Sequence, residues 1–328
     1  MRSLDQLPIP KLRSRGVARS LLTAGAFMFL ASAAEAQTTK LIVPIPAGGA
    51  GDILARVLAD QIARTHAVTM VIENRPGGST LVGTEAVARA APDGSSLLVA
   101  GTGFVINPHL RKTNYDPLTS FEPICHLANL PTVIVVKSSS PYTKLADLLD
   151  AARRKPGQLT LASIGPASTS HIAFEMLKRA AKADITFVPF PGTAPALNAL
   201  LGDHVTSFLG NYAEVAEHLK AGTLRALAAA STARIEPAPD LPTLTELGYK
   251  VAVGEIWYGL VAPAKTAKET TLRLSDWFAV ASQAPDVKAK LVANGTYPAI
   301  MCGADYHAFL RSQSDEYGRA IREAKIQP

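Results

Sequence analysis

A glycine-rich segment near the start of the chain has the residue types best suited to binding a small anion. Residues 43–52 read VPIPAGGAGD and join an expected strand to an expected helix. Glycines let the main chain approach a ligand closely, and the free N–H groups of a helix N-terminus favour negative charge. The segment lacks the Lys-Ser/Thr of a P-loop and the G-x-G-x-x-G spacing of a dinucleotide site. It therefore predicts either a small-anion site, with Asp52 as the helix N-cap, or an ordinary strand-to-helix turn.

Two later segments repeat this strand, turn and helix arrangement. Residues 162–171 read ASIGPASTSH, and residues 188–196 read VPFPGTAPA. One of Ser168, Thr169 and Ser170 is expected to cap the following helix, which leaves the other hydroxyls free to bind a ligand carboxylate. The three turns are therefore candidates to converge on one cleft.

Other chemically suggestive residues have simpler structural interpretations. His171 and Glu175 are spaced as a metal-binding pair, but no third ligand is evident, so we expect a packed histidine and no metal. Trp257 and Tyr258 are interpreted as core residues where the chain crosses between lobes, with stacking on an aromatic ligand as the alternative. Arg75, in Asn-Arg-Pro-Gly-Gly, is expected to tether a loop.

Patterns typical of hydrolases are absent from the sequence. It contains no G-x-S-x-G and no H-E-x-x-H, and its scattered histidines suggest no triad. An exported hydrolase is therefore the disfavoured alternative, and we expect no catalytic residues and no cofactor.

Short β-branched runs alternate with Ala- and Leu-rich stretches along the chain. This alternation predicts an α/β fold of parallel sheets covered by helices. The expected strands are 40–45, 69–73, 96–100, 132–137, 158–162, 186–189 and 257–262. The expected helices are 52–65, 81–90, 144–154, 170–181, 194–202, 214–221, 270–283 and 306–323.

The N-terminus has the features of a secretory signal peptide. Five basic residues precede an uncharged run from Ser20 to Ala34, and Ala34-Glu35-Ala36 forms a cleavage site, so we expect removal after Ala36 and a periplasmic protein. Removal takes away five basic and two acidic residues and lowers the formal charge from +6 to +3. The remaining charge is dispersed, so nucleic acid and anionic membrane surfaces are not expected partners.

The length that remains after removal of the signal peptide indicates the domain organisation, and the two cysteines leave two alternatives open. A mature chain of this size exceeds a usual single core, and Pro/Ser-rich breaks at residues 137–141 and 236–248 favour two domains. Cys125 and Cys302 can either form a disulfide, which an exported protein would keep, or remain buried thiols.

Taken together, these segments resemble the Bug family, the TctC-like substrate-binding proteins of tripartite tricarboxylate transporters. The resemblance covers the mature chain and depends on the order and spacing of several motifs. These are residues 43–52, ENRPGG at 73–78, ARAAPDG at 88–94, YDP at 115–117, residues 165–171 and 188–197, Pro242-Thr243, and Trp257-Tyr258-Gly259 with Pro263.

The resemblance implies a bilobed, type II periplasmic-binding-protein-like fold without catalysis. It implies lobe 1 at residues 37–137 and 251–328, lobe 2 at 138–250, and a monomer that carries a small carboxylate to membrane permease subunits. A signalling receptor is an alternative partner with identical binding chemistry. The implied ligand-binding residues are Ile45, Ala47, Gly48, Gly49, Ala50, Asp52, Gly165, Ser168, Thr169, Gly192, Thr193 and Ala194.

The chain departs from the family pattern at its turns. Ile45 replaces the usual aromatic residue, and residues 47–51 replace the usual Pro-Gly-Gly-Ser-Ser, so the first turn has no hydroxyls. Ala167 replaces a common glycine, and Pro191 stands where lysine is frequent. These changes predict a smaller, differently shaped or less polar ligand, and they leave its identity open.

Overall fold

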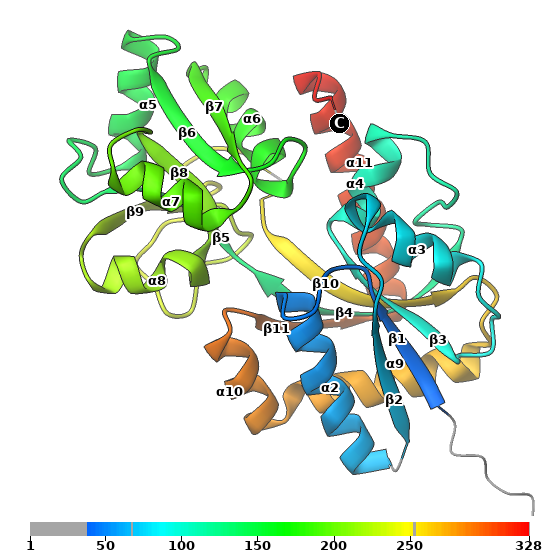
Figure 1. The fold of residues 1–328 in the computed structure, drawn as a ribbon. Coiled ribbons are helices and arrows are strands. Elements are labelled where there is room, and N and C mark those ends of the chain that lie inside the picture. Colours follow the sequence, from blue (N-terminus) through cyan, green and yellow to red (C-terminus); the bar gives the residue numbers. More distant parts are fainter. Residues whose placement is uncertain (1–37, 67, 252–253, 328) are drawn as a thin grey trace, which may run out of the picture. The chain divides into compact units, whose positions relative to one another are not determined.

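The computed structural model describes residues 38–66, 68–251 and 254–327. The predicted signal peptide and its cleavage site lie outside these residues. The described chain forms two β-sheets with helices on both faces of each sheet (Figure 1). The α/β prediction is confirmed, and every predicted strand and helix is present.

The first sheet contains six strands in the order β11-β4-β10-β3-β1-β2. β1, β2 and β3 are parallel, whereas β10 runs antiparallel to both β3 and β4. The prediction of a purely parallel sheet is therefore wrong, because β10 inserts between β3 and β4 in the opposite direction. The strand bounds are β1 Thr38–Val43, β2 Thr69–Asn74, β3 Ser96–Gly101, β4 Phe121–Leu130, β10 Ile256–Pro263 and β11 Tyr297–Cys302.

The second sheet contains five strands in the order β7-β6-β8-β5-β9. It is also mixed, since β5 runs antiparallel to β8 and β9. β5 belongs to this sheet although the predicted boundary after residue 137 assigns it to the first lobe. The strand bounds are β5 Thr132–Lys137, β6 Leu159–Ile164, β7 Ile185–Phe190, β8 Ser207–Asn211 and β9 Leu224–Ala229.

Alternating strand side chains pack into separate cores on the two faces of each sheet. Leu41 and Val43 of β1 join the core under α2, α9 and α10, whereas Ile42 joins the core under α3, α4 and α11. In the second sheet, α5 and α6 cover one face, and α7 and α8 cover the other. Fully burying one such aliphatic side chain contributes about 1.5–3 kcal/mol, so this alternation fixes the register of each strand.

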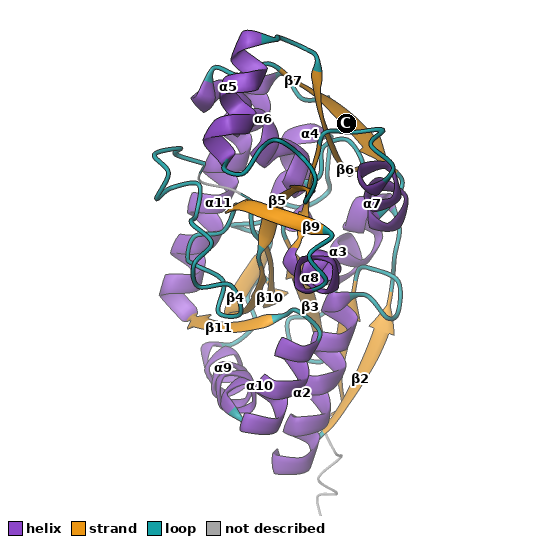
Figure 2. Cartoon of the chain, turned by 90° about the vertical axis from the view of Figure 1, so that its left-hand side faces the viewer, coloured by secondary structure: helices purple, strands orange, loops and turns teal. Residues whose placement is uncertain are grey.

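A helix follows most of the strands, and Figure 2 shows α2, α9 and α10 side by side. A short 3₁₀ helix, Gly78–Thr80, precedes α3. The helix bounds are α2 Ala50–His66, α3 Leu81–Ala88, α4 Gly103–Leu110, α5 Leu145–Arg154, α6 Thr169–Ala181, α7 Thr193–Leu201, α8 Tyr212–Lys220, α9 Lys268–Gln283, α10 Pro285–Ala293 and α11 Gly303–Ala324.

A disulfide joins Cys125 of β4 to Cys302 of β11. The two residues are directly paired in the antiparallel register of these neighbouring strands. Of the two alternatives that the sequence leaves open for the cysteines, the structure has the disulfide.

Candidate functional site

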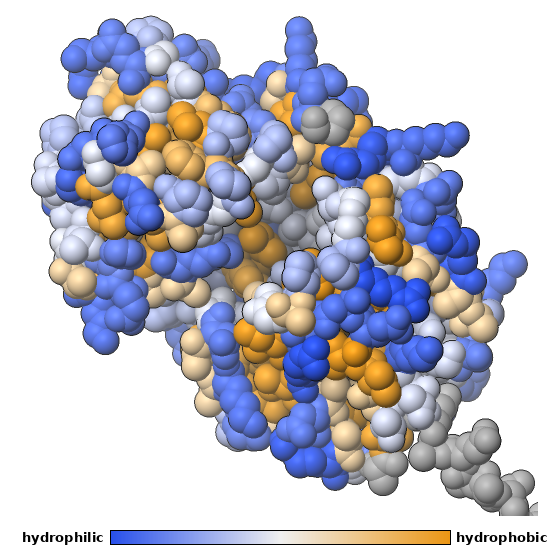
Figure 3. All heavy atoms as spheres, viewed as in Figure 1, coloured by the Kyte–Doolittle hydropathy of each residue, from blue (hydrophilic) through white to orange (hydrophobic). Residues whose placement is uncertain are grey.

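A cavity of about 350 Å³ lies at the N-terminal ends of helices α4 and α6. α4 follows a strand of the first sheet and α6 follows a strand of the second, so both sheets contribute to the cavity. Figure 3 shows that this face of the molecule is hollowed near its centre, with less polar residues inside the hollow. The lining residues are Ile45, Ser79, Thr80, Gly101, Thr102, Gly103, Ile106, Asn107, Leu110, Arg111, Ile164, Pro166, Ala167, Ser168, Thr169, Ser170, Ile256 and Tyr258.

The hydroxyl-rich turn before α6 forms one wall of the cavity. Ser168 is the N-cap of α6: its Oγ accepts a hydrogen bond from His171 N at 3.2 Å and donates one to Ile164 O at 2.8 Å. The predicted capping by one of the three hydroxyl residues is therefore confirmed. The N–H groups of the first turn of a helix have no partner within the helix, so this wall offers hydrogen-bond donors and positive potential.

The start of α4 forms the facing wall. Thr102 and Gly103 line the cavity here. The Thr102 carbonyl accepts hydrogen bonds from the backbone N–H groups of Val105 and Ile106, which form the first turn of the helix. The Thr169 hydroxyl donates to the Thr102 hydroxyl at 2.9 Å, and both threonines are buried. The positive ends of two helices, one from each sheet, therefore meet at a pair of hydroxyl groups.

Arg111 brings a cation to the same cavity. It follows the last residue of α4, and its Nε is buried without a hydrogen-bond partner. Among the described residues, its side chain forms no ion pair. A buried guanidinium nitrogen that lacks an acceptor is costly unless a ligand or water supplies one, which makes Arg111 a candidate anion ligand. Arg111 is not among the residues predicted from the sequence, because Pro108 interrupts the sequence pattern of the helix that positions it.

The loop before α3 closes one side of the cavity in an unusual backbone conformation. Ser79 and Thr80 have φ values of 55° and 81°, a region that non-glycine residues seldom occupy. Asn107 Nδ2 donates to the Ser79 carbonyl at 2.6 Å and holds the loop in place. Such backbone strain is frequent where a loop must present its groups to a ligand.

The first glycine-rich turn contributes less to the cavity than the sequence predicts. Of its predicted residues only Ile45 lines the cavity, and Ala47, Gly48, Gly49 and Ala50 do not. Tyr258 also lines it, and the same side chain packs against the core of the first sheet, as the interpretation of a core residue expects. Its ring packs against Gly51, where a Cβ would lie 2.7 Å from Tyr258 Cε1.

Asp52 organises this turn from inside the helix. It is the third residue of α2, so the prediction of an N-cap is wrong. Its buried carboxylate accepts hydrogen bonds from Gly48 N, Arg56 Nε and Asn74 Nδ2, each at 2.9 Å. Burial raises its pKa, but these hydrogen bonds prevail and hold the pKa below its ordinary value. Asp52 therefore shapes the turn as an ionised group.

The remaining predicted site residues do not line the cavity. Gly165 is absent from the lining, although Ile164 and Pro166 on either side of it are present. Gly192, Thr193 and Ala194 are also absent, and the Thr193 hydroxyl donates to Glu214 Oε2 at 2.9 Å. The structure thus brings together Ile45, Ser168 and Thr169 from the predicted set.

His171 and Arg75 have the structural contacts expected from the sequence. His171 Nδ1 accepts a hydrogen bond from Ala167 N at 3.0 Å, and its ring stacks on Phe187. Arg75 pairs with Glu73 at 2.7 Å on the surface. Within the described ranges, no group of three or more His, Cys, Asp or Glu side chains could hold a metal ion.

Comparisons with known proteins match this chain over most of its length. Residues 54–326 match the family model TctC, described as the tripartite tricarboxylate transporter family receptor. Protein BugT of Bordetella pertussis is 30% identical over 294 residues, which cover 88% of this chain and 89% of BugT. None of the helices in the described part of the chain is both long and apolar enough to cross a bilayer.

Solved structures of related proteins have the same fold. A TctC solute-binding protein from Polaromonas matches with a TM-score of 0.79 and 27% identity, covering 88% of this chain and 99% of that one. The R. palustris protein Rpa4515, solved with adipate, matches with a TM-score of 0.74 and 29% identity over 89% and 98% of the two chains. MatC from Rhodopseudomonas palustris, solved with malate, matches with a TM-score of 0.69 and 27% identity over 87% and 98%. This chain therefore belongs to the TctC family of tripartite tricarboxylate transporter receptors, and it is a solute-binding protein, as predicted, and not an enzyme.

Proposed function

We propose that this protein captures a small dicarboxylate outside the cytoplasmic membrane and that the cavity between the starts of α4 and α6 is its binding site. The relatives solved with adipate and malate support a carboxylate ligand. The convergence of two helix N-termini on one cavity, where two threonine hydroxyls meet, is the observation that carries the proposal.

One carboxylate of the ligand would accept hydrogen bonds from the first turns of both helices and from the Thr102 hydroxyl, whose oxygen accepts the hydrogen bond from Thr169. Hydrogen bonds to a charged group contribute about 1.5–3 kcal/mol each, so three or four of them support micromolar affinity, about −8 kcal/mol, after ordering costs. Because the donors come from both sheets, the ligand would hold the two sheets together.

The second carboxylate would pair with Arg111. The buried Nε of Arg111 has no hydrogen-bond partner among the described residues, and Arg111 lines the same cavity. Apolar side chains of Ile106, Leu110 and Ile256 also line the cavity and suit the carbon chain between two acid groups. A dicarboxylate therefore uses the cavity more completely than a monocarboxylate.

The predicted site residues keep distinct roles in this proposal. Ile45, Ser168 and Thr169 would contact the ligand in the present arrangement. Asp52 would act indirectly, because its carboxylate already accepts three hydrogen bonds within the turn. The others would reach the ligand when the two lobes close around it: Ala47, Gly48, Gly49, Ala50, Gly165, Gly192, Thr193 and Ala194.

We also propose the cellular setting that the sequence predicts. The chain would be exported, cleaved after Ala36 and active as a periplasmic monomer. Its two lobes would be those that the sequence predicts, 37–137 with 251–328 and 138–250, except that β5 would belong to the second lobe, because it pairs in the second sheet. It would deliver the solute to permease subunits of a tripartite transporter, and purification with a signalling receptor instead would identify a sensor partner.

Calorimetric titration of residues 37–328 with dicarboxylates and with monocarboxylates of equal length tests the proposal. Arg111→Gln should weaken dicarboxylate binding about 10- to 150-fold, the equivalent of a lost interaction of about 1.5–3 kcal/mol, and leave monocarboxylate binding nearly unchanged. Lys112→Gln removes a neighbouring exposed cation that does not line the cavity, so it should leave both affinities unchanged.

Thr169→Val should weaken both classes of ligand, because it removes the hydrogen bond that orients the Thr102 hydroxyl toward the shared carboxylate. Native mass spectrometry must first show that no retained ligand fills the site. If Arg111→Gln weakens mono- and dicarboxylates equally, Arg111 does not bind the second acid group. If no carboxylate binds the empty protein, the carboxylate assignment itself is wrong.

A further inference from the structure

The side chain of Thr80 reaches the first turn of α4 from the neighbouring loop. Thr80 lines the ligand cavity, the cavity between the starts of α4 and α6. A Cβ at Gly103, the first residue of α4, would lie 3.2 Å from the Thr80 hydroxyl oxygen. The same oxygen lies 3.4 Å from Nδ2 of Asn107, one turn further along the helix. The Thr80 hydroxyl is therefore beside the helix N-terminus at which the proposed carboxylate binds.

The hydrogen bonds around this hydroxyl leave its proton for a ligand. Asn107 Nδ2 also donates to the Ser79 carbonyl at 2.6 Å, and a carbonyl can only accept, so this end of the amide is the NH2 group. The Thr80 oxygen therefore accepts from Asn107. No residue that the structure describes accepts a hydrogen bond from the Thr80 hydroxyl, because the bond from Thr84 Oγ1 goes to the Thr80 carbonyl. A carboxylate in the cavity would supply the missing acceptor.

The backbone conformation that brings Thr80 to this place is strained. Gly77, Gly78, Ser79 and Thr80 all have positive φ values, and the value for Thr80 is 81°. Glycine adopts such angles readily, whereas a β-branched residue seldom does, because its Cβ crowds the backbone. A glycine at position 80 would follow the same path with less strain. The conformation alone therefore does not explain a threonine, and the hydroxyl is what a glycine would lack.

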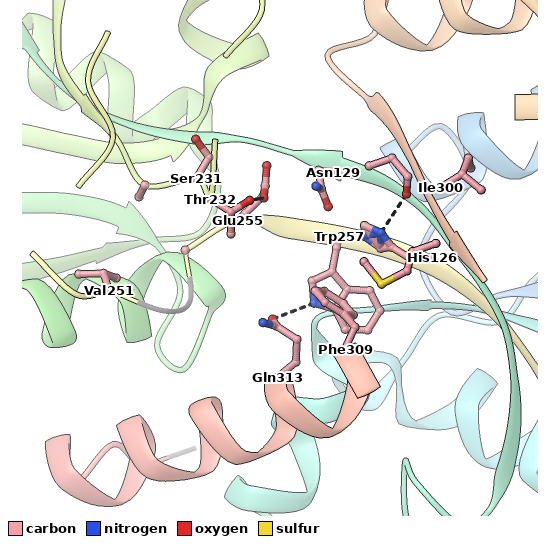
Figure 4. A pocket seen from close by; sticks show the side chains of 14 residues that line it. His126, Asn129, Ser231, Thr232, Val251, Glu255, Trp257, Ile300, Phe309 and Gln313 are labelled. Atoms are coloured by element: carbon pink, nitrogen blue, oxygen red, sulfur yellow. Dashed lines mark hydrogen bonds between the residues drawn. The ribbon is translucent and has the colours of Figure 1, made fainter. Parts of the chain in front are cut away.

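Strand β10 forms a separate wall of the ligand cavity and is held from its other face. Ile256 and Tyr258 line the ligand cavity, whereas Trp257 between them lines a second cavity of about 380 Å³ (Figure 4). Trp257 is only 1% exposed, its ring packs edge to face with Phe309 at 5.4 Å between centroids, and its Nε1 donates to Gln313 Oε1 at 3.2 Å. Because this packing holds β10, we expect substitutions at position 80 to change the loop and leave the β10 wall in place.

We propose that Thr80 is a ligand-binding residue: its hydroxyl donates to the carboxylate at the N-terminus of α4, and the strained loop is retained because it holds that hydroxyl in place. This inference rests on the proposed function, since it adds a donor to the same site. The carboxylate receives hydrogen bonds from hydroxyls on two sides of Gly103, those of Thr102 and Thr80. Gly103 lets Thr80 come this close because it has no side chain.

Three substitutions at position 80 separate the hydroxyl from the backbone. The assay is calorimetric titration of residues 37–328 with succinate, glutarate and adipate, and with the monocarboxylates of equal length. Thr80→Val keeps the branched shape and removes the hydroxyl, so it should weaken both ligand classes about 10-fold or more, whereas Arg111→Gln weakens the dicarboxylates alone. Thr80→Ser keeps the hydroxyl and should leave both affinities nearly unchanged. Thr80→Ala removes the hydroxyl without the branched shape and should match Thr80→Val, which covers a valine variant that does not fold.

Thr80→Gly tests whether the strain is retained for binding. This variant should unfold at a higher urea concentration than the parent, because the strain is relieved, and yet bind carboxylates as weakly as Thr80→Val. Lys265→Gly is the matched control. Lys265 also has a positive φ, 68°, but it is exposed and does not line the ligand cavity. Its replacement should raise the urea midpoint and leave carboxylate affinity unchanged.

Four results would overturn the inference, and they are distinguishable from one another. Equal affinity in the parent and in Thr80→Val would mean that Thr80 does not bind the ligand, and the proposed function would stand. A loss in Thr80→Ser as large as in Thr80→Val would give Thr80 a purely structural role. A glycine variant no more stable than the parent would mean that the loop retains no strain for binding. A parent protein that binds no carboxylate would refute the proposed function and this inference together.

Discussion

At the residue scale, the contact between Gly51 and Tyr258 connects the first glycine-rich turn to the cavity. A Cβ at position 51 would lie 2.7 Å from Tyr258 Cε1, and Tyr258 lines the cavity. Gly51→Ala should therefore destabilise the protein by about 1–3 kcal/mol through overpacking, although alanine favours a helix by about 1 kcal/mol. Urea unfolding measures the loss of stability, and calorimetry should show weaker carboxylate binding as the tyrosine ring shifts.

A double-mutant cycle separates this contact from other effects of the substitution. In a Tyr258→Ala background the obstacle is gone, so Gly51→Ala should be neutral or slightly stabilising. An equal cost in both backgrounds would mean that Tyr258 is not the reason position 51 requires glycine.

The carboxylate of Asp52 should make stability depend on pH in the acid range. Its folded-state pKa lies below the ordinary value of 3.8, so its contribution is fully present above pH 3.8 and lost as pH falls through the lowered pKa. Asp52→Asn should cost about 1–3 kcal/mol near neutral pH. The gap between the two unfolding curves should narrow as the solution is acidified below that range, and a constant gap would contradict this role.

At the element scale, the disulfide fastens the edge strand β11 to β4. Closing a loop of this length stabilises typical proteins by about 2–4 kcal/mol, mainly by restricting the unfolded chain. The Cys125→Ala, Cys302→Ala variant should therefore unfold at a lower urea concentration than the parent. Reduced parent protein serves as the comparison, and it should behave like the variant. A reductant that has no effect on the parent would contradict a stabilising role.

The elements that sequence periodicity identifies are those with a simple pattern. The predicted strands are short apolar runs, the predicted helices are longer stretches that are mostly rich in Ala or Leu, and both sets are present. The patterns do not identify β4, which contains Pro123 and His126, or β9, whose Leu-Arg-Ala-Leu-Ala-Ala is typical of a helix. Tertiary pairing overrides local preference in these strands.

Part of the candidate site cannot be predicted from the sequence, because the element that carries it also has no simple pattern. Helix α4 has eight residues and contains Asn107 and Pro108, so neither length nor periodicity reveals it. The sequence patterns therefore do not predict that the N-terminus of α4 and Arg111 line the cavity. The turn at Ser168 follows a strand with a clear pattern, so the sequence does predict it. The first glycine-rich turn has the right composition, but Tyr258 packs against Gly51 there, and sequence spacing does not encode that contact.

At the scale of the whole molecule, each sheet has two separate cores, and α6 contributes to cores of both sheets. Ile172 of α6 packs with Trp257 and residues of α11 in a core of the first sheet, whereas Phe174 packs within the second. A helix whose N-terminus lines the ligand cavity is thus packed against both sheets. A shift of α6 on ligand binding at its N-terminus would therefore change the packing of the same helix against both sheets.

The position of β10 has a consequence for the order in which the chain can fold. β10 lies between β3 and β4, yet it follows the whole second sheet in sequence. As the chain emerges N-terminus first, the strands of the second sheet are complete once Ala229 is available, while β3 and β4 still lack the strand that joins them. Cys125 must likewise remain a thiol until Cys302, in the last strand, becomes available. Until β10 and β11 are available, one edge of β3, both edges of β4 and the Cys125 thiol therefore lack their partners, and only the C-terminal part of the chain can cover them.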